Sequence, residues 1–265
     1  MLRLLLLLLL LVPLTACQGS FKVPKEQYRE RVKTLGVLPL MVDGQSIIAH
    51  PEPAAVVAMV RKYSSKQQVH LVELLQAKKS YFDVREVSGD PQRLMSRLLR
   101  SRSLRETPIG PHHYYEVVPG VVAELCRENV VDAVLVVVMN GTTRVQKRWD
   151  RARPTYLEAP FNDVQASAVV VLPSGEVVWE YYGPAGKPFL ALQYADFDEA
   201  YYNKTDEVPV HFVTLAGLER ALTESGGSWF KDTKLSKPYQ ELFQDLVNQL
   251  TPGMLNPFAP RPVTE

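Results

Sequence analysis

The run Val134-Leu135-Val136-Val137-Val138 is the most hydrophobic segment after residue 17 and determines the fold we expect. It is β-branched and almost without interruption, as in a strand that is buried on both faces of a sheet. The sequence therefore predicts a central strand over 130–139.

Helical and strand-like segments alternate before this run. Strands are expected over 33–42, ending or bulging at Pro39, and over 82–87. Helices are expected over 54–79 with a division at Ser64-Ser65, from Asp90-Pro91 to about Arg102, and over 113–128. In the last of these, Pro119-Gly120 is either an interruption or the true start. This order implies right-handed crossovers and a largely parallel core.

A hairpin follows the central strand. Segments 163–172 and 176–182 are rich in β-forming residues and flank the short loop Pro173-Ser174-Gly175. The segment 140–162 is polar and basic and has no clear assignment. We therefore expect an α/β fold: a mixed sheet with parallel core strands, crossover helices and an antiparallel hairpin.

A mostly helical C-terminal extension is expected over 183–253. Its helices are predicted over 210–223 and after Ser236, where Tyr239, Leu242, Phe243, Leu246 and Leu250 share one face. Residues 254–265, with three prolines, are expected to form a flexible tail.

The N-terminus carries a short apolar run that ends in Leu14-Thr15-Ala16-Cys17. The run is too short to span a bilayer and is typical of a secretory signal. The four residues resemble a bacterial lipobox, which implies removal of 1–16 and lipidation of Cys17. Gln18 in place of aspartate favours the outer membrane over the inner one. We expect a lipidated tether over 17–31, an α/β domain over 32–182 and a location on the periplasmic face.

Three segments together resemble one family. They are Val-Leu-Pro-Leu at 37–40, Val-Asp-Ala-Val-Leu-Val-Val at 131–137 and Pro-Ser-Gly-Glu-Val-Val-Trp-Glu at 173–180. Their order after a lipobox resembles bacterial envelope lipoproteins related to the TolB N-terminal domain, including the curli secretion lipoprotein. The resemblance covers 32–182. It implies a non-enzymatic domain that docks other envelope proteins or assembles with itself.

Composition sets further limits. Without Arg3 the chain has 29 basic and 29 acidic residues, a balance that does not point to nucleic acid. The chain has two cysteines, Cys17 and Cys126. If Cys17 is lipidated, Cys126 has no second thiol to pair with, so no intramolecular disulfide is expected. Its apolar helical setting predicts that it is buried.

The sequence lacks the common catalytic signatures, such as Gly-x-Ser-x-Gly and His-Glu-x-x-His. Gly186-Lys187 departs from a phosphate loop at Tyr181 and Pro188. His112-His113 lacks the further ligands that zinc needs, and Asp196, Asp198 and Glu199 lack the spacing of a calcium loop. We therefore expect no enzyme activity, no metal and no cofactor.

Two basic clusters are candidate surfaces. Arg93, Arg97 and Arg100 lie near one helical face, with Arg102 and Arg105 beyond them. The second cluster is Arg144, Lys147, Arg148, Trp149 and Arg151, with Arg153 beside it. Such surfaces attract lipid headgroups or acidic partners, although a charged solvent face is the plainer interpretation.

The expected role is that of a membrane-anchored, non-catalytic binding or assembly component of the cell envelope. One alternative is a lipid-anchored hydrolase with a cleft that unites His112, Asp163 and a serine or threonine. The other is a lipoprotein that binds a small ligand in a pocket lined by Tyr181, Tyr182, Tyr194, Tyr201 and Tyr202.

Overall fold

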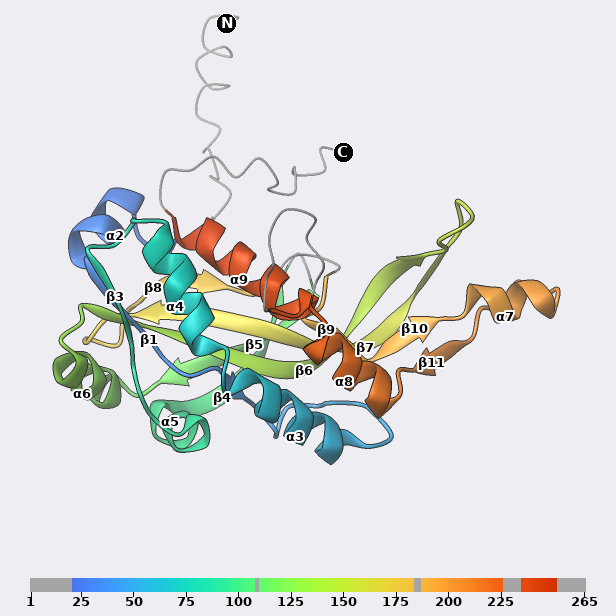
Figure 1. Cartoon of the computed structure of the whole chain (residues 1–265), viewed down its shortest axis with the longest axis horizontal. Helices are drawn as coiled ribbons and strands as arrows, with labels where there is room; N and C mark the ends of the chain where they lie inside the picture. Colours follow the sequence, from blue (N-terminus) through green and yellow to red (C-terminus); the bar gives the residue numbers. More distant parts are fainter. Residues whose placement is uncertain (1–20, 108–109, 184–186, 226–234, 252–265) are drawn as a thin grey trace, which may run out of the picture.

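The computed structural model describes residues 21–107, 110–183, 187–225 and 235–251. A mixed sheet lies at its centre, in the strand order β3-β1-β6-β7-β8 (Figure 1). The strands are β3 (Asp83–Glu86), β1 (Thr34–Val37), β6 (Ala133–Trp149), β7 (Tyr156–Val171) and β8 (Val177–Tyr181). The first three run parallel, and β7 and β8 are antiparallel to their neighbours. The predicted fold class is confirmed.

The predicted central run lies inside β6 and is fully buried. Leu135 and Val137 face a core formed with α3 (Pro53–Ser64), α4 (Gln68–Ala77) and α9 (Lys237–Leu250). Val134, Val136 and Val138 face a second core formed with α5 (Pro91–Leu98) and α6 (Pro119–Asn129). Because successive side chains of a strand point to opposite faces, covering both faces requires an unbroken apolar run.

The first predicted strand divides at Pro39, as expected. β1 ends at Val37, and β2 (Met41–Val42) resumes the pairing with β6 through Met41 and Val138. Proline cannot donate to a strand ladder, so the break falls there.

The predicted long helix also divides near Ser64-Ser65, into α3 and α4. The Asp90 side chain caps α5 by accepting a 2.9 Å hydrogen bond from the Arg93 backbone N–H. The helix ends at Leu98, so the predicted end at Arg102 is wrong.

The hairpin of β4 (Leu99–Thr107) and β5 (Gly110–Val117) replaces two predicted helical segments. α6 begins at Pro119, so the alternative in which Pro119-Gly120 is the true start is confirmed, and the alternative in which the helix begins at His113 is wrong. Proline suits the first helical turn, where its missing N–H costs nothing, and the preceding residues are free to pair as a strand.

The expected β7–β8 hairpin is confirmed. Its loop closes through a 3.0 Å hydrogen bond from Leu172 N to Glu176 O, and Gly175 has a φ of 86° that favours glycine. The unassigned segment 140–162 completes β6 and β7, whose ladder runs from Val134–Val171 to Trp149–Tyr156.

The segment after Gly183 contains strands as well as helices. It forms β9 (Leu190–Ala191), β10 (Gln193–Ala195), α7 (Phe197–Tyr202), β11 (Val210–Phe212), α8 (Leu215–Thr223) and α9. The helix predicted over 210–223 therefore begins later, at Leu215. The predicted apolar face of α9 is buried and joins the core shared with α3 and α4.

Part of the expected tether is folded. α2 (Lys25–Arg31) packs Tyr28 into the core, and Phe21 bridges to Trp179 of β8. The predicted signal (1–16), Cys17, Gln18 and the tail over 254–265 lie outside the described residues. Among the described helices, none has the length and apolar character needed to cross a membrane.

Val130 ends α6 in the left-handed region (φ 52°, ψ 57°), which a β-branched residue adopts at a cost. Its side chain is 68% exposed and therefore has little packing to lose. We expect Val130→Gly to raise the free energy of unfolding by about 1 kcal/mol in urea denaturation. Val130→Asn should give a smaller gain. A loss of stability with glycine would contradict the strain.

Cys126 is buried, as predicted. Burial, with a further contribution from the Asp132 carboxylate, raises the pKa of its thiol to about 11. Because the folded state holds this proton more tightly, stability should fall as the pH rises from the ordinary thiol value of about 8.5 toward 11.

Native Cys17→Ser protein, in which Cys126 is the one remaining thiol, should therefore react slowly with iodoacetamide at neutral pH and fast in urea. Equal rates in the two states would contradict the burial of the thiol.

Candidate functional site

Two arms project from one end of the molecule (Figure 1). The β6–β7 arm comprises 142–149 of β6, 156–162 of β7 and the loop between them. The β10–β11 arm comprises β10, α7 and β11, and the two strands pair antiparallel. The arms touch through Arg153, whose guanidinium lies 4.6 Å from the Tyr201 ring centroid.

The β6–β7 arm has an inner face that is polar and mostly buried. Thr142, Arg144 and Gln146 are at most 6% exposed, and Asp163 of β7 is fully buried. Gln146 donates to the Asp163 carboxylate, and Arg148 Nη2 donates to its Oδ1 at 3.2 Å. The β4–β5 hairpin covers the base of this face, where His113 Nε2 lies 2.9 Å from Gly141 O.

Charges on this face are held away from water. Burial raises the pKa of Asp163, while Gln146 and the guanidinium groups of Arg148 and Arg144 oppose that rise. Burial also lowers the pKa of Arg144, against the attraction of Asp163. A buried carboxylate that binds side chains of the neighbouring strand fixes the arm to the body.

The outer face of the same arm is exposed and aromatic. Trp149 is 61% exposed, Tyr156 47% and Val145 66%. The Trp149 and Tyr156 rings pack together with centroids 5.0 Å apart. Lys147 lies 4.9 Å above the Tyr156 ring and 3.7 Å from Glu158.

The predicted surface cluster is therefore divided between two faces. Lys147 and Trp149 lie on the outer face, and Arg151 is exposed in the loop at the tip. Arg144 is buried and Arg148 is half-buried against Asp163, so neither belongs to the exposed surface. The two-residue period of a strand separates 144, 146 and 148 from 145, 147 and 149.

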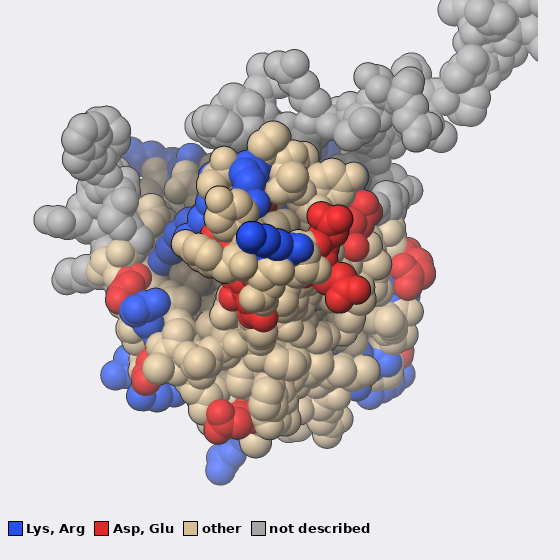
Figure 2. Space-filling view, turned by 90° about the vertical axis from the view of Figure 1, so that its right-hand side faces the viewer, with Lys and Arg blue, Asp and Glu red and all other residues tan. Residues whose placement is uncertain are grey.

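Charge also differs between the arms. The β6–β7 arm exposes the basic side chains of Lys147 and Arg151. The β10–β11 arm and its loop are acidic and carry Asp196, Asp198, Glu199, Asp206 and Glu207. Figure 2 views this end of the molecule: in its upper part, acidic side chains lie mainly to the right and basic ones at the centre and left.

His112 and Asp163, the two residues named for a hydrolase site, have different hydrogen-bond partners. The ring nitrogens of His112 lie 2.7 Å from Gly110 O and 2.9 Å from Tyr182 O, whereas Asp163 binds Gln146 and Arg148. Burial lowers the pKa of His112, and it also lowers the pKa of His113. Thr107 Oγ1 lies 3.1 Å from His112 Nδ1, so a hydroxyl does approach the imidazole, but Asp163 is engaged by Gln146 and Arg148 and does not complete a triad with them.

One group of metal-type ligands was not predicted from the sequence. Nε2 of His211 lies 2.9 Å from Glu199 Oε2 and 3.9 Å from Asp196 Oδ2. The β10–β11 pairing brings His211 beside the acidic residues, a contact that sequence spacing does not reveal. His211 and Glu199 bind one another and Asp196 caps α7, so the fold accounts for this group without a metal. Asp198 is not part of it.

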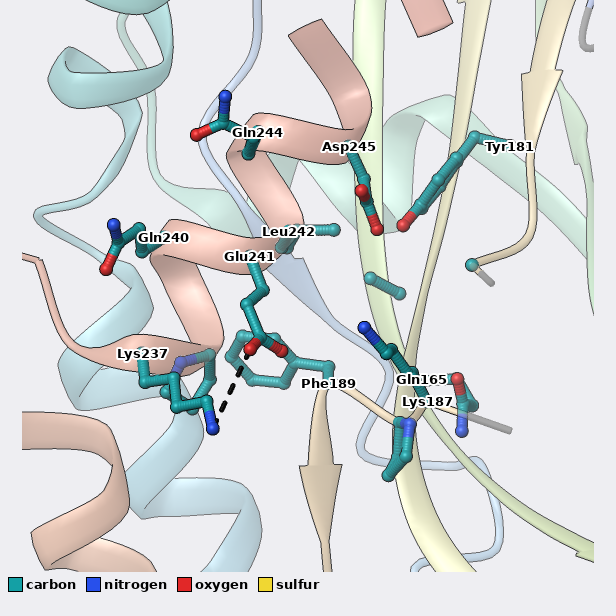
Figure 3. Close-up of a pocket in the computed structure, with 14 residues that line it drawn as sticks. Gln165, Tyr181, Lys187, Phe189, Lys237, Gln240, Glu241, Leu242, Gln244 and Asp245 are labelled. Carbon is teal, nitrogen blue, oxygen red and sulfur yellow. Dashed lines mark ion pairs between the residues drawn. The ribbon is translucent and has the colours of Figure 1, made fainter. Parts of the chain in front are cut away.

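A hollow of about 420 Å³ lies between α9 and strands β7 and β8 (Figure 3). The Asp245 carboxylate and the Tyr181 hydroxyl point toward one another there. Burial raises the pKa of both groups, and each lies among charged neighbours. Lys237 and Glu241 form a 3.8 Å ion pair at its rim.

The tyrosines proposed to line one pocket lie apart. Tyr181 alone among the five lines this hollow. Tyr182 donates to Glu180, and Tyr194, Tyr201 and Tyr202 lie on the β10–β11 arm. Lys187 lines the hollow, whereas Gly186 lies outside the described residues.

No family model and no curated protein sequence matches this chain. Among solved structures, the chain is similar to a protein from Helicobacter pylori described as a neuraminyllactose-binding hemagglutinin homologue, at 9% identity and a TM-score of 0.38. The similarity covers 83% of this chain and 87% of the other. Likeness at that level carries no argument about function.

Because Arg148 and Lys147 lie on opposite faces of the arm, we expect their substitution to have different effects on stability. Arg148→Met leaves the buried Asp163 carboxylate without its guanidinium, and we expect a loss of about 2 kcal/mol in the free energy of unfolding. Lys147→Met alters an exposed side chain and should change stability by less than about 0.5 kcal/mol. Urea denaturation of both variants measures the difference, and equal effects would contradict the assignment of the faces.

Proposed function

We propose that the protein is a lipid-anchored, non-catalytic component of the bacterial cell envelope that binds a protein partner through the outer face of the β6–β7 arm. Lipidation of Cys17 would hold it at the outer membrane, on the periplasmic face. The sequence resemblance to envelope lipoproteins related to the TolB N-terminal domain is compatible with this role.

The observation that carries the proposal is the exposed pair Trp149 and Tyr156 on a braced strand ladder. Large exposed apolar patches on folded domains mark interaction sites. Trp, Tyr and Arg dominate the residues that contribute most to protein–protein binding. The buried contacts of Asp163 hold the ladder in place, so little ordering cost remains for binding.

The charges at the arm indicate the chemistry of the partner. Lys147 and the exposed Arg151 flank the aromatic pair. Arg153 is held by Asp150 at 2.9 Å and by Tyr201, so it closes the gap between the arms. A complementary surface would offer an apolar pocket with an acidic rim.

The position of the arm favours a protein over the headgroups of the anchoring membrane. Phe21 bridges to Trp179 at the strand end where β6 begins, and Val170, the partner of Trp179, also pairs with Leu135. From Leu135 to Trp149 the strand extends about 46 Å. Four residues from Cys17 to Phe21 span at most about 14 Å. The aromatic face thus reaches away from the anchored end.

Site-specific photocrosslinking in intact cells tests the proposal. A photoreactive residue at Tyr156 should form a defined adduct with one envelope protein, and the same residue at Phe82 should not. Phe82 is 89% exposed and lies at the other end of the sheet, because it binds Lys33 at the start of β1. Trp149→Ala and Arg151→Glu should each reduce the adduct at Tyr156 by about tenfold.

Two controls complete the experiment. Phe82→Ala should leave the Tyr156 adduct unchanged, and Cys17→Ser should remove the protein from the membrane fraction. Adducts with lipid alone at Tyr156, or an adduct unaffected by Trp149→Ala, would contradict a protein partner at this face.

A further inference from the structure

A second crevice, with a volume of about 1030 Å³, lies on the body of the molecule. It opens at the carboxyl end of β2, between α3 and α5. The connection after β2, through α3 and α4, packs in the core on one face of the sheet. The connection after β3, through α5 and α6, packs in the core on the other face. In α/β sheets, crevices at the carboxyl ends of strands whose connections leave opposite faces are the usual ligand sites.

Three arginines line this crevice: Arg61 of α3, and Arg100 and Arg102 of β4. The one acidic side chain among the lining residues is Asp43, which is buried. Its carboxylate accepts hydrogen bonds from Arg102 Nη1 at 2.7 Å, from the Tyr115 hydroxyl at 3.0 Å and from Gln45 N at 2.9 Å. Asp43 is thus occupied in positioning Arg102, and the lining keeps a positive balance.

Two of these guanidinium groups retain donors. Among the described residues, Arg61 has no side-chain hydrogen bond or ion pair, and Arg102 engages a partner through Nη1 alone. Arg61 lies against Gly44, where an added Cβ would come 2.7 Å from its Nη2. Because Arg102 binds Asp43 and Arg61 contacts Gly44, the two cations flank consecutive residues. Arg100 is partly neutralised by Glu116 at 3.6 Å.

One part of the crevice wall is apolar, beside polar residues such as Gln92 and Ser96. Val57 of α3 and Met95 and Leu99 near the end of α5 are half-buried, and Ile47 of the intervening loop is 72% exposed. A ligand that fits would carry an anionic group at one end and an apolar part at the other. Arginine's planar fork of donors matches phosphate oxygens in pairs, which favours phosphate over a weaker anion.

We propose that this crevice binds a phosphate-bearing small molecule. Arg61 and Arg102 hold the phosphate, and the wall formed by Val57, Met95 and Leu99 receives the apolar portion. The site is independent of the partner-binding face on the arm.

Calorimetric titration of the full chain carrying Cys17→Ser, with phenyl phosphate as the probe, tests the site. We expect a Kd on the order of 1 mM or tighter, with competition by inorganic phosphate. Arg61→Gln should weaken binding by about tenfold, and it should fold normally because Arg61 has no partner to lose. Arg127→Gln, an exposed arginine on α6, should leave the affinity unchanged.

Met95→Ala separates the two halves of the site. It should weaken phenyl phosphate more than inorganic phosphate. A short-chain phosphatidylglycerol, kept monomeric, distinguishes a lipid headgroup from a soluble phosphate ester. Binding of this lipid that is lost in Arg61→Gln identifies a headgroup, whereas binding of phenyl phosphate alone identifies a soluble ester. No binding of either probe, or equal affinities in the Arg61→Gln and Arg127→Gln proteins, would overturn the proposal.

Discussion

The antiparallel ladder between β6 and β7 is the constraint on which the other features depend. It pairs Val134 with Val171 at one end and Trp149 with Tyr156 at the other, and it keeps its register throughout. Because a strand alternates its side chains, this register decides what each face meets over the whole length. Within the body both faces meet apolar cores. Beyond Gly141, one face stays covered and the other is open to solvent.

Where β6 leaves the body, one of its faces is still covered, so the side chains on that face must be buried. Here the solution is polar: Thr142, Arg144 and Gln146 continue the face that carries Val134, Val136 and Val138 within the core. Charged groups at such positions are costly unless they are paired. Asp163, opposite Thr142, supplies the opposite charge and binds Arg148 and Gln146. These contacts compensate the cost of burying the charge, and they also hold the arm in one orientation.

The hydrophobic pattern revealed the buried parts of the fold and little else. The strand over 134–138 and the apolar face of α9 could be predicted because each must bury a continuous surface. β4 could not: its residues are exposed along most of the strand, so no alternation marks it, and pairing with β5 decides its structure. The arm was hidden for a related reason, because a covered polar face and an exposed face both read as polar. The crevice depends on Arg61 and Arg102, which two different crossovers bring to the same loop.

That loop connects the crevice to the base of the arm. Asp43 N donates to Met139 O at 2.8 Å, and Gly141 N donates to Ser46 Oγ at 2.8 Å. An added Cβ at Gly141 would lie 2.3 Å from the Ile47 carbonyl, so only glycine allows the loop to pack this closely on β6. The same loop places Asp43 against Arg102 and Tyr115. These contacts fix the loop that forms one wall of the crevice, so little ordering of that wall is left for binding to impose. A ligand could then alter the arm only by as much as it favours one arrangement of this loop over another. The tight packing at Gly141 leaves little room for a second arrangement, so the structure favours a crevice and an arm that work as fixed parts of one frame.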